Sequence, residues 1–222
     1  MESETIQHAI LEATKQALQS PISRPRYRLP IDEATATEML RMAYIQQVAL
    51  RGKEAVLDQY TEQSIRKIGR WLTSETGKPM LLLYGGVGNG KTTMARAIKS
   101  VMNTLAKINN DRNKSVAFVE MVTAKQQVRS YRSDSKSWES LCKRHYLIID
   151  DFGEEPVEVM DYGNVINPVI DLLSQRYDDQ HLTILTTNVT NKQIRKTYGD
   201  RIADRFNEIM KVIIFTNPSY RS

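Results

Sequence analysis

The sequence contains little cysteine and no long hydrophobic run, and these absences exclude several classes of protein. Cys142 is the single cysteine among 222 residues, which excludes an intrachain disulfide. No apolar stretch approaches the roughly 20 residues that a membrane-spanning helix needs. The first residues, Met1 to Glu4, are acidic and lack the apolar segment of a signal peptide. We therefore expect a globular protein of the cytoplasm.

Proline and glycine are also scarce, and both are unevenly distributed. Three of the seven prolines lie in the segment 21–30, where three arginines alternate with them. Proline interrupts helices and strands, so this segment is interpreted as a linker that follows an amphipathic helix over residues 1–20. The net charge of +5 and the pI of about 9.2 favour a polyanionic partner only weakly.

Four of the ten glycines gather in one short segment that fits the phosphate-binding P-loop pattern G-x-x-x-x-G-K-[ST]. The apolar run Met80–Tyr84 precedes it as a buried strand, and Thr93–Lys107 follows it with the spacing of an amphipathic helix. Glycines let successive N–H groups turn toward phosphate oxygens, and the helix start adds partial positive charge. The segment consists of Gly85, Gly86, Val87, Gly88, Asn89, Gly90, Lys91, Thr92 and Thr93.

The residues of this segment predict an ATP site. Lys91 is expected to reach the β- and γ-phosphates, and the Thr92 hydroxyl is expected to bind Mg²⁺. The alternative is a glycine-rich turn that binds nothing. The Lys-Thr pair and the correct flanking strand and helix disfavour that alternative.

A second apolar strand, Tyr146–Asp150, ends in two carboxylates. In P-loop proteins this place is the Walker B site, so Asp150 is expected to organise Mg²⁺ and Asp151 to act as general base on the attacking water. A capping pair of aspartates at a strand end is the alternative. The next apolar strand ends in Thr186-Thr187-Asn188, where Asn188 is expected to orient the water or touch the γ-phosphate, although such a sequence is also a common turn signal.

Arg201 and Arg205 lie four residues apart, on one face of a helix. They could pair with Asp200, Asp204 or Glu208 at the surface, or one could serve as an arginine finger for the nucleotide of a neighbouring subunit. The sequence alone leaves both alternatives open.

Strands and helices alternate from Met80 onward, which predicts an α/β fold with a parallel sheet covered on both faces. Before them, Asp32 is expected to cap a helix that runs to about Leu50, and a second helix is expected over Thr61–Thr73. The expected strands are Met80–Tyr84, Val116–Met121, Tyr146–Asp150, Leu182–Thr187 and Val212–Phe215. The expected helices between them are Thr93–Lys107, Thr123–Tyr131, Ser137–Arg144, Val165–Tyr177, Asn191–Tyr198 and Arg201–Glu208.

The combination resembles the AAA+ ATPases of the DnaC/IstB class, which comprises bacterial replicative helicase loaders and transposition helper ATPases. The resemblance covers about residues 78–222. Besides the P-loop it rests on Leu147–Gly153, Thr187-Asn188, Gly199–Arg205 and the terminal Ser219–Ser222. The Asp-Asp-x-Gly and Ser-Tyr-Arg pieces are the more specific ones.

The resemblance implies a P-loop NTPase three-layer sandwich with a five-stranded parallel sheet in the order 5-1-4-3-2. It implies that Asn188 is the sensor 1 residue, Arg205 the arginine finger with Arg201 as the alternative, and Arg221 the sensor 2 arginine. It also implies a head-to-tail ring or spiral of identical subunits with nucleotide between them, and DNA along the inner surface. Most AAA+ enzymes carry Asp-Glu where this chain has Asp150-Asp151, so the shorter Asp151 side chain makes efficient hydrolysis less certain than nucleotide binding.

We divide the chain into residues 1–30 (helix and linker), 31–77 (a helical segment leading into the core) and 78–222 (the ATPase domain). The leading hypothesis is a helicase loader whose N-terminal 75 residues grip the helicase, and the close competitor is a transposition helper that recruits a transposase. A small-molecule kinase and a nucleotide-gated scaffold with negligible turnover are the alternatives from other classes.

DNA contact is expected from a basic stretch that carries two aromatic residues, Tyr131 and Trp138. Single-strand binders combine cations with stacking aromatics, and single-stranded DNA is favoured here over duplex. The alternative is a solvated helix face with Trp138 in the core. The cations of the stretch are Lys125, Arg129, Arg132, Lys136, Lys143 and Arg144.

Overall fold

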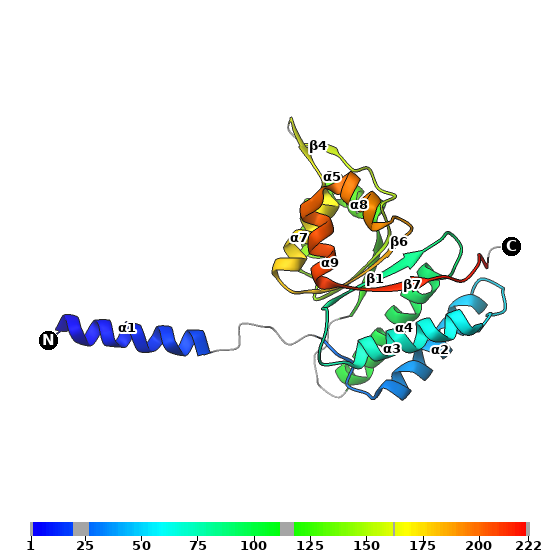
Figure 1. The fold of residues 1–222 in the computed structure, drawn as a ribbon, viewed down its shortest axis with the longest axis horizontal. Coiled ribbons are helices and arrows are strands. Elements are labelled where there is room, and N and C mark those ends of the chain that lie inside the picture. Colours follow the sequence, from blue (N-terminus) through cyan, green and yellow to red (C-terminus); the bar gives the residue numbers. More distant parts are fainter. Residues whose placement is uncertain (1, 20–26, 112–117, 162, 221–222) are drawn as a thin grey trace.

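The structure, a computed structural model, describes residues 2–19, 27–111, 118–161 and 163–220 (Figure 1). Its elements follow in the order α1 (Glu2–Gln19), α2 (Glu33–Ala49), α3 (Gln59–Thr73), β1 (Met80–Gly85), α4 (Lys91–Asp111), β2 (Glu120–Thr123), α5 (Ala124–Ser133), α6 (Ser135–Lys143), β3 (Tyr146–Phe152), β4 (Val159–Asp161), β5 (Asn164–Ile166), α7 (Pro168–Asp178), β6 (Leu182–Thr187), α8 (Asn191–Tyr198), α9 (Asp200–Ile209) and β7 (Met210–Phe215).

The main sheet has five strands in the order β2-β3-β6-β1-β7, and every neighbouring pair is parallel. When these five strands are numbered along the chain, this is the order 5-1-4-3-2, so the expected topology is confirmed. The carboxyl ends of parallel strands meet at one edge of the sheet. The P-loop after β1, the carboxylates at the end of β3 and Asn188 after β6 therefore lie along that edge.

Two helical layers cover the sheet, which makes the expected three-layer sandwich (Figure 1). One hydrophobic cluster joins α2, α3 and α4 to one face, and the other joins α5 to α9 to the opposite face. Successive side chains of β1 point to opposite faces of the sheet. Leu81 and Leu83 accordingly belong to the first cluster, whereas Met80 and Leu82 belong to the second. A strand buried on both faces accounts for the uninterrupted apolar runs in the sequence.

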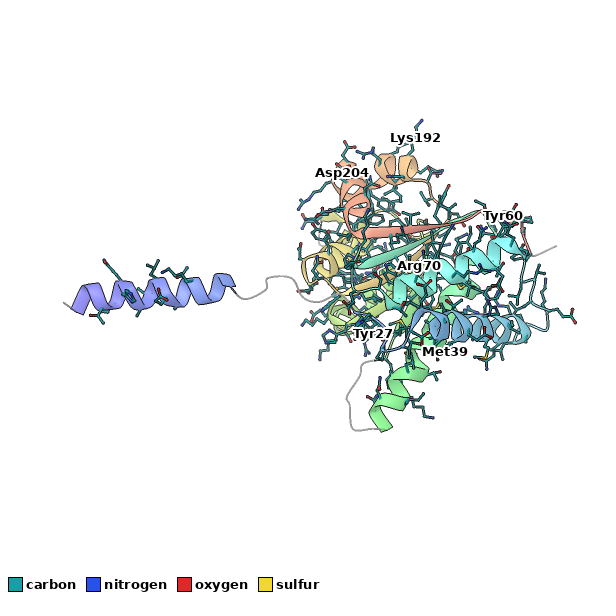
Figure 2. All side chains as sticks on the ribbon, turned by 60° about the horizontal axis from the view of Figure 1, so that its bottom comes forward. Tyr27, Met39, Tyr60, Arg70, Lys192 and Asp204 are labelled. Carbon is teal, nitrogen blue, oxygen red and sulfur yellow. The ribbon has the colours of Figure 1, made fainter. Side chains whose placement is uncertain are left out.

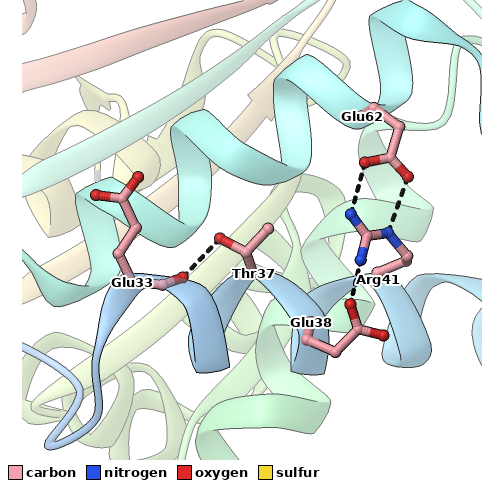
Figure 3. Close-up of polar contacts among 5 residues, drawn as sticks. All are labelled: Glu33, Thr37, Glu38, Arg41 and Glu62. Atoms are coloured by element: carbon pink, nitrogen blue, oxygen red, sulfur yellow. Dashed lines mark hydrogen bonds and ion pairs between the residues drawn. The ribbon is translucent and has the colours of Figure 1, made fainter.

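Helices α2 and α3 pack side by side within the first layer. Each begins with an aspartate cap: Asp32 accepts a bond from the Thr35 N–H at 2.9 Å, as expected, and Asp58 accepts one from the Thr61 N–H at 2.8 Å. Between the helices, the Arg41 guanidinium makes two parallel bonds of 2.9 and 2.8 Å to the Glu62 carboxylate (Figure 3). Leu40 and Ile65 bury one face of each helix in the first cluster, whereas Met42 and Ile45 of α2 remain exposed.

Several element boundaries differ from the sequence-based expectation, and those of α7 and β2 are described here. The helix expected to begin at Val165 begins at Pro168, because Asn167 caps it and Val165 pairs with Met160 in a β-hairpin. Strand β2 begins at Glu120 and continues to Thr123, two residues beyond the expected end. Residues 116 and 117 of the expected strand lie outside the described residues.

The hairpin of β4 and β5 was not expected from the sequence. Met160 and Val165 lie opposite each other and are both exposed, whereas Val159 is buried against the second cluster. The Tyr131 hydroxyl donates a bond of 2.6 Å to Asp161 and fastens the hairpin to α5. Strands of three residues give almost no periodic signal, which explains why the sequence did not reveal them.

The N-terminal helix α1 lies apart from the sandwich (Figures 1 and 2). Its described apolar side chains Ile6, Ile10 and Leu11 are exposed by 60%, 61% and 53%. The expected linker, residues 21–30, includes a residue that belongs to the core. Leu29 is buried in the first cluster, and its N–H donates a bond of 2.7 Å to the Leu72 carbonyl. No helix of the described residues has both the length and the apolar composition to cross a bilayer.

We predict that deleting residues 1–26 leaves the melting temperature unchanged, because the described apolar side chains of α1 contact nothing in the sandwich. Deleting residues 1–30 also removes Leu29, and loss of a buried leucine costs about 2–5 kcal/mol. In a chain of this size each kcal/mol lowers the melting temperature by roughly 2–4 °C. The matched control is Leu29→Ala in the full chain. A marked fall in melting temperature on deletion of residues 1–26 would show that α1 packs on the core.

Candidate nucleotide-binding site

The P-loop connects the end of β1 to the start of α4. Gly88 and Gly90 have φ angles of +82° and +91°, which side-chain-bearing residues rarely adopt. A Cβ on Gly85 would lie 2.5 Å from the Phe215 carbonyl oxygen, so only glycine allows β7 to approach so closely. Two kinds of constraint, backbone conformation and close approach, thus account for Gly85, Gly88 and Gly90, whereas neither applies to Gly86.

Lys91 is buried at the first turn of α4, and its ammonium is surrounded by oxygen atoms. It donates to the carbonyls of Gly85 and Gly86 at 2.9 and 2.6 Å, and to the side-chain oxygens of Asn89 and Asn188 at 3.1 and 2.6 Å. A buried ammonium needs such partners, since it has left water. Lys91 and Asn188 are therefore brought together at the P-loop, 97 residues apart in the sequence.

The side chains of Thr92 and Asp150 are hydrogen-bonded to each other. The Thr92 hydroxyl donates to Asp150 Oδ1 at 3.0 Å, and the Thr186 hydroxyl donates to the same oxygen at 2.5 Å. Hard oxygen ligands of this type fit Mg²⁺, which commonly binds one or two protein groups together with nucleotide phosphates and water. The described residues contain no cluster of three or more acidic, histidine or cysteine side chains that would hold a metal without such phosphates.

Asp151 has an unusual backbone at the end of β3. Its φ is +56°, and the pairing of β3 with β6 shifts register between Ile149 and Phe152. The Thr186 hydroxyl accepts a bond of 2.9 Å from the Asp151 N–H and so supports this conformation. As a result, Asp150 remains buried while Asp151 is exposed and lines the cleft.

The cleft itself has a volume of about 170 Å³ and is open to solvent. Residues 87–93 of the P-loop and the start of α4 line it together with Asp151 and Asn188. Its other lining residues are Tyr44 and Val48 of α2, Arg51 and Lys53 of the segment after α2, and Tyr220 of the C-terminal segment. The cleft therefore combines phosphate-binding groups with aromatic, aliphatic and cationic side chains.

Arg201 and Arg205 of α9 are not among the residues that line this cleft. Arg201 is exposed, and Arg205 lies over the Tyr177 ring, with its guanidinium carbon 4.9 Å from the ring centre. The surface ion pairs considered for these arginines do not form among the described residues, because Arg195 binds both Asp200 and Asp204. Arg221 lies outside the described residues.

The sequence analysis assigned no role to several residues that the structure places at the site. Thr186 binds the Asp150 carboxylate and the Asp151 N–H. Its position near the end of the strand before Asn188 was the sequence signal that could have identified it. Glu155 is buried, accepts bonds from the Gly153 N–H and the Tyr198 hydroxyl at 2.8 Å each, and so holds the loop after β3. Tyr44 gave no signal, because its contact with the P-loop depends on how α2 packs.

The two aromatic residues of the basic stretch are both half-buried. Trp138 packs against the second hydrophobic cluster, and the Tyr131 ring contacts it edge-on with ring centres 5.1 Å apart. Trp138 thus packs on the core, as the alternative interpretation expected, and stacking of DNA bases on these rings stays a prediction. Lys125 and Arg144 pair with Glu154 and Glu120. The cations that remain exposed, with no ion pair among the described residues, are Arg129, Arg132, Lys136 and Lys143.

The fold and the cleft define the class of the protein as a P-loop nucleotide-binding protein of the AAA+ type. The family model of the IstB-like ATP binding proteins matches residues 39–222. The chain therefore belongs to the IstB-like ATP-binding family. A comparison with curated protein sequences finds no significant match.

Solved structures support the same fold. The DnaC helicase loader is 17% identical, with a TM-score of 0.54 over 73% of this chain and 93% of that one. DnaI is 20% identical, with a TM-score of 0.53 over 88% and 96% of the two chains. AMPPCP-bound DnaA from Aquifex aeolicus is 14% identical, with a TM-score of 0.50 over 72% and 48%. At such identities the likeness establishes the architecture alone.

We predict that Lys91→Ala abolishes ATP binding, because it removes the cation held at the phosphate end of the cleft. The dissociation constant should rise at least about 100-fold, or about 2.8 kcal/mol. Isothermal titration measures it, and a melting curve shows whether the variant folds. The control is Arg195→Ala, which removes an exposed cation far from the P-loop in sequence. An affinity for ATP within about threefold of the wild type, less than 1 kcal/mol, would refute the P-loop assignment.

Proposed function

We propose that this protein binds ATP with Mg²⁺ in the cleft and hydrolyses it to ADP and phosphate to remodel protein–DNA assemblies. The observation that carries the proposal is that Lys91 bonds to Asn188 and Thr92 bonds to Asp150, so that these four residues converge at the P-loop. Lys91 and Thr92 begin α4 after β1, Asp150 lies near the end of β3 and Asn188 follows β6, and these three strands are neighbours in the sheet. Phosphate binding requires a cation and inward N–H groups, and hydrolysis requires a base and a positioned water, and both sets lie together here.

In the proposed reaction, P-loop N–H groups and Lys91 bind the β- and γ-phosphates, and Thr92 and Asp150 would hold Mg²⁺. The metal would supply positive charge that neutralises the phosphate oxygens. Asp151 takes the proton of the attacking water as general base, and its exposed position in the cleft gives it access to that water. Asn188 orients the water or contacts the γ-phosphate once Lys91 turns from its side chain to the phosphate.

Arg51 and Lys53 line the cleft besides Lys91, and among the described residues no arginine of α9 does. We therefore propose that an α9 arginine acts between subunits, as the resemblance implies. Arg205 is the proposed finger, supplied to the nucleotide of a neighbouring copy, with Arg201 as the alternative. Arg205 is held over Tyr177, whereas Arg201 is exposed and has no ion pair among the described residues. Arg221 is proposed as the sensor 2 residue of the same subunit, on the resemblance alone.

DNA is the proposed polyanionic partner. The exposed cations of α5 and α6, Arg129, Arg132, Lys136 and Lys143, lie on two consecutive helices and have no ion pair among the described residues. Phosphate contacts by such cations give affinity that falls steeply with salt. Single-stranded DNA remains the favoured form, with duplex as the alternative.

The leading role is that of a helicase loader, and a transposition helper is the second candidate, favoured by the family description. In either role a partner must be held. Helix α1 is the proposed partner arm, because it lies apart from the sandwich and its Ile6, Ile10 and Leu11 are exposed. Pull-down of the full chain and of the chain lacking residues 1–26, against a replicative helicase and a transposase, separates the two roles.

We predict that Asp151→Asn leaves ATP affinity unchanged and stops turnover, because an amide keeps the shape but takes no proton from water. Phosphate release is measured with and without DNA. The matched control is Glu154→Gln, a neutralised carboxylate three residues away that is expected to hydrolyse normally. If Asp151→Asn hydrolyses ATP at the wild-type rate, the base is Glu154 or Glu155, or the water is positioned by Asn188 alone.

We predict that Arg205→Ala binds nucleotide as a monomer but loses ATPase activity in the assembly. Mixing it with Asp151→Asn should restore part of the activity, since some interfaces then pair an intact carboxylate with an intact finger. Arg201→Ala, tested in the same mixture, identifies which arginine acts. If co-assembled mixtures show no recovery at any ratio for either arginine, neither residue acts across the interface.

A further inference from the structure

The C-terminal segment is hydrogen-bonded to the P-loop. The Asn89 side chain donates to the Phe215 carbonyl at 2.9 Å, and the Asn217 side chain donates to the Asn89 carbonyl at 2.9 Å. Further along, the Tyr220 N–H donates to the Gly88 carbonyl at 3.0 Å. In these three bonds the loop contributes carbonyl groups and the Asn89 side chain, and none of its backbone N–H groups. The bonds therefore do not compete with phosphate for those N–H groups.

Tyr220 also reaches in the opposite direction, to the start of α3. Its hydroxyl donates to Asp58 Oδ2 at 2.5 Å and lies 2.9 Å from the Thr61 hydroxyl. Burial, together with the bond to Asp58, raises the pKa of Tyr220 to about 12, so the hydroxyl keeps its proton at neutral pH and can donate. Asp58 is itself fixed, because its other oxygen caps α3.

Tyr220 thus connects the start of α3 to the P-loop. Gly88 has a φ of +82° and no side chain to hold its orientation. Its carbonyl depends on the position of the Tyr220 main chain, and that position depends on the hydroxyl bonds to α3. The Tyr220 ring lines the cleft directly.

We propose that Tyr220 is a positioning residue of the nucleotide site, holding the Gly88 carbonyl through its main chain and fixing that contact to α3 through its hydroxyl. The inference rests on the proposed function, because it concerns the same cleft. It adds that the start of α3, which does not itself belong to the P-loop, sets the geometry in which the loop receives phosphates. A preformed loop binds more tightly because less conformational entropy is lost on binding.

The test is Tyr220→Phe, which keeps the ring and removes the two hydroxyl contacts. Its control is Tyr131→Phe, which removes a comparable bond to Asp161 and a hydroxyl whose pKa is likewise raised to about 12, away from the cleft. Tyr220→Phe is expected to weaken ATP binding about tenfold, and to raise KM while kcat stays within about twofold. Tyr131→Phe is expected to leave ATP affinity within about twofold, even if both variants melt at a similarly lowered temperature.

A second variant tests the route through α3. Asp58→Asn keeps an oxygen for the α3 cap but removes the charged acceptor of the Tyr220 hydroxyl, so it should also weaken ATP binding. Combined with Tyr220→Phe it should add little, because both changes break the same contact.

The proposal is overturned if Tyr220→Phe binds ATP as the wild type does, or if Tyr131→Phe weakens binding equally. In both cases, loss of ATP binding in Lys91→Ala would still support the assignment of the P-loop as the nucleotide site. If the wild-type chain binds no ATP, the proposed function and this inference fall together.

Discussion

The contact on which the site depends is that between the Lys91 ammonium and the oxygen atoms around it. A buried cation is stable only where oxygens surround it, and here they come from the P-loop and from Asn188 at the end of β6. That arrangement requires β6 to lie beside β1, as the sheet order provides. It also requires glycines where the loop turns. The cation is therefore in place, with its oxygen partners available for exchange with phosphate.

Much of this arrangement could be predicted from the sequence, because each part has a local signal. Leu81, Leu83 and their neighbours form an apolar run that identifies a strand buried on both faces, and the order of such strands followed from the family resemblance. Once strands are parallel, their carboxyl ends meet at one edge. Asp150 and Asn188 then come together without any signal that links them in the sequence.

The remaining features depend on packing between distant segments, which leaves no local pattern. Tyr220 and Asp58 are bonded across 162 positions. Arg176 is fully buried and donates to the carbonyls of Leu141, Arg144 and Leu182. Neither contact can be inferred from periodicity. The hairpin after β3 was missed for the opposite reason, because its strands are too short for a periodic pattern to appear.

The central claim is that Lys91 and the loop around it recognise phosphate, and a series of ligands tests it most directly. The dissociation constants of adenosine, AMP, ADP and ATP, each measured with Mg²⁺ on the wild-type chain, report where the binding energy lies. The account predicts weak binding of adenosine and AMP, and a gain of at least about tenfold when the β-phosphate is added, or about 1.4 kcal/mol. Equal affinity for adenosine and ATP, or no binding of any of the four, would contradict it.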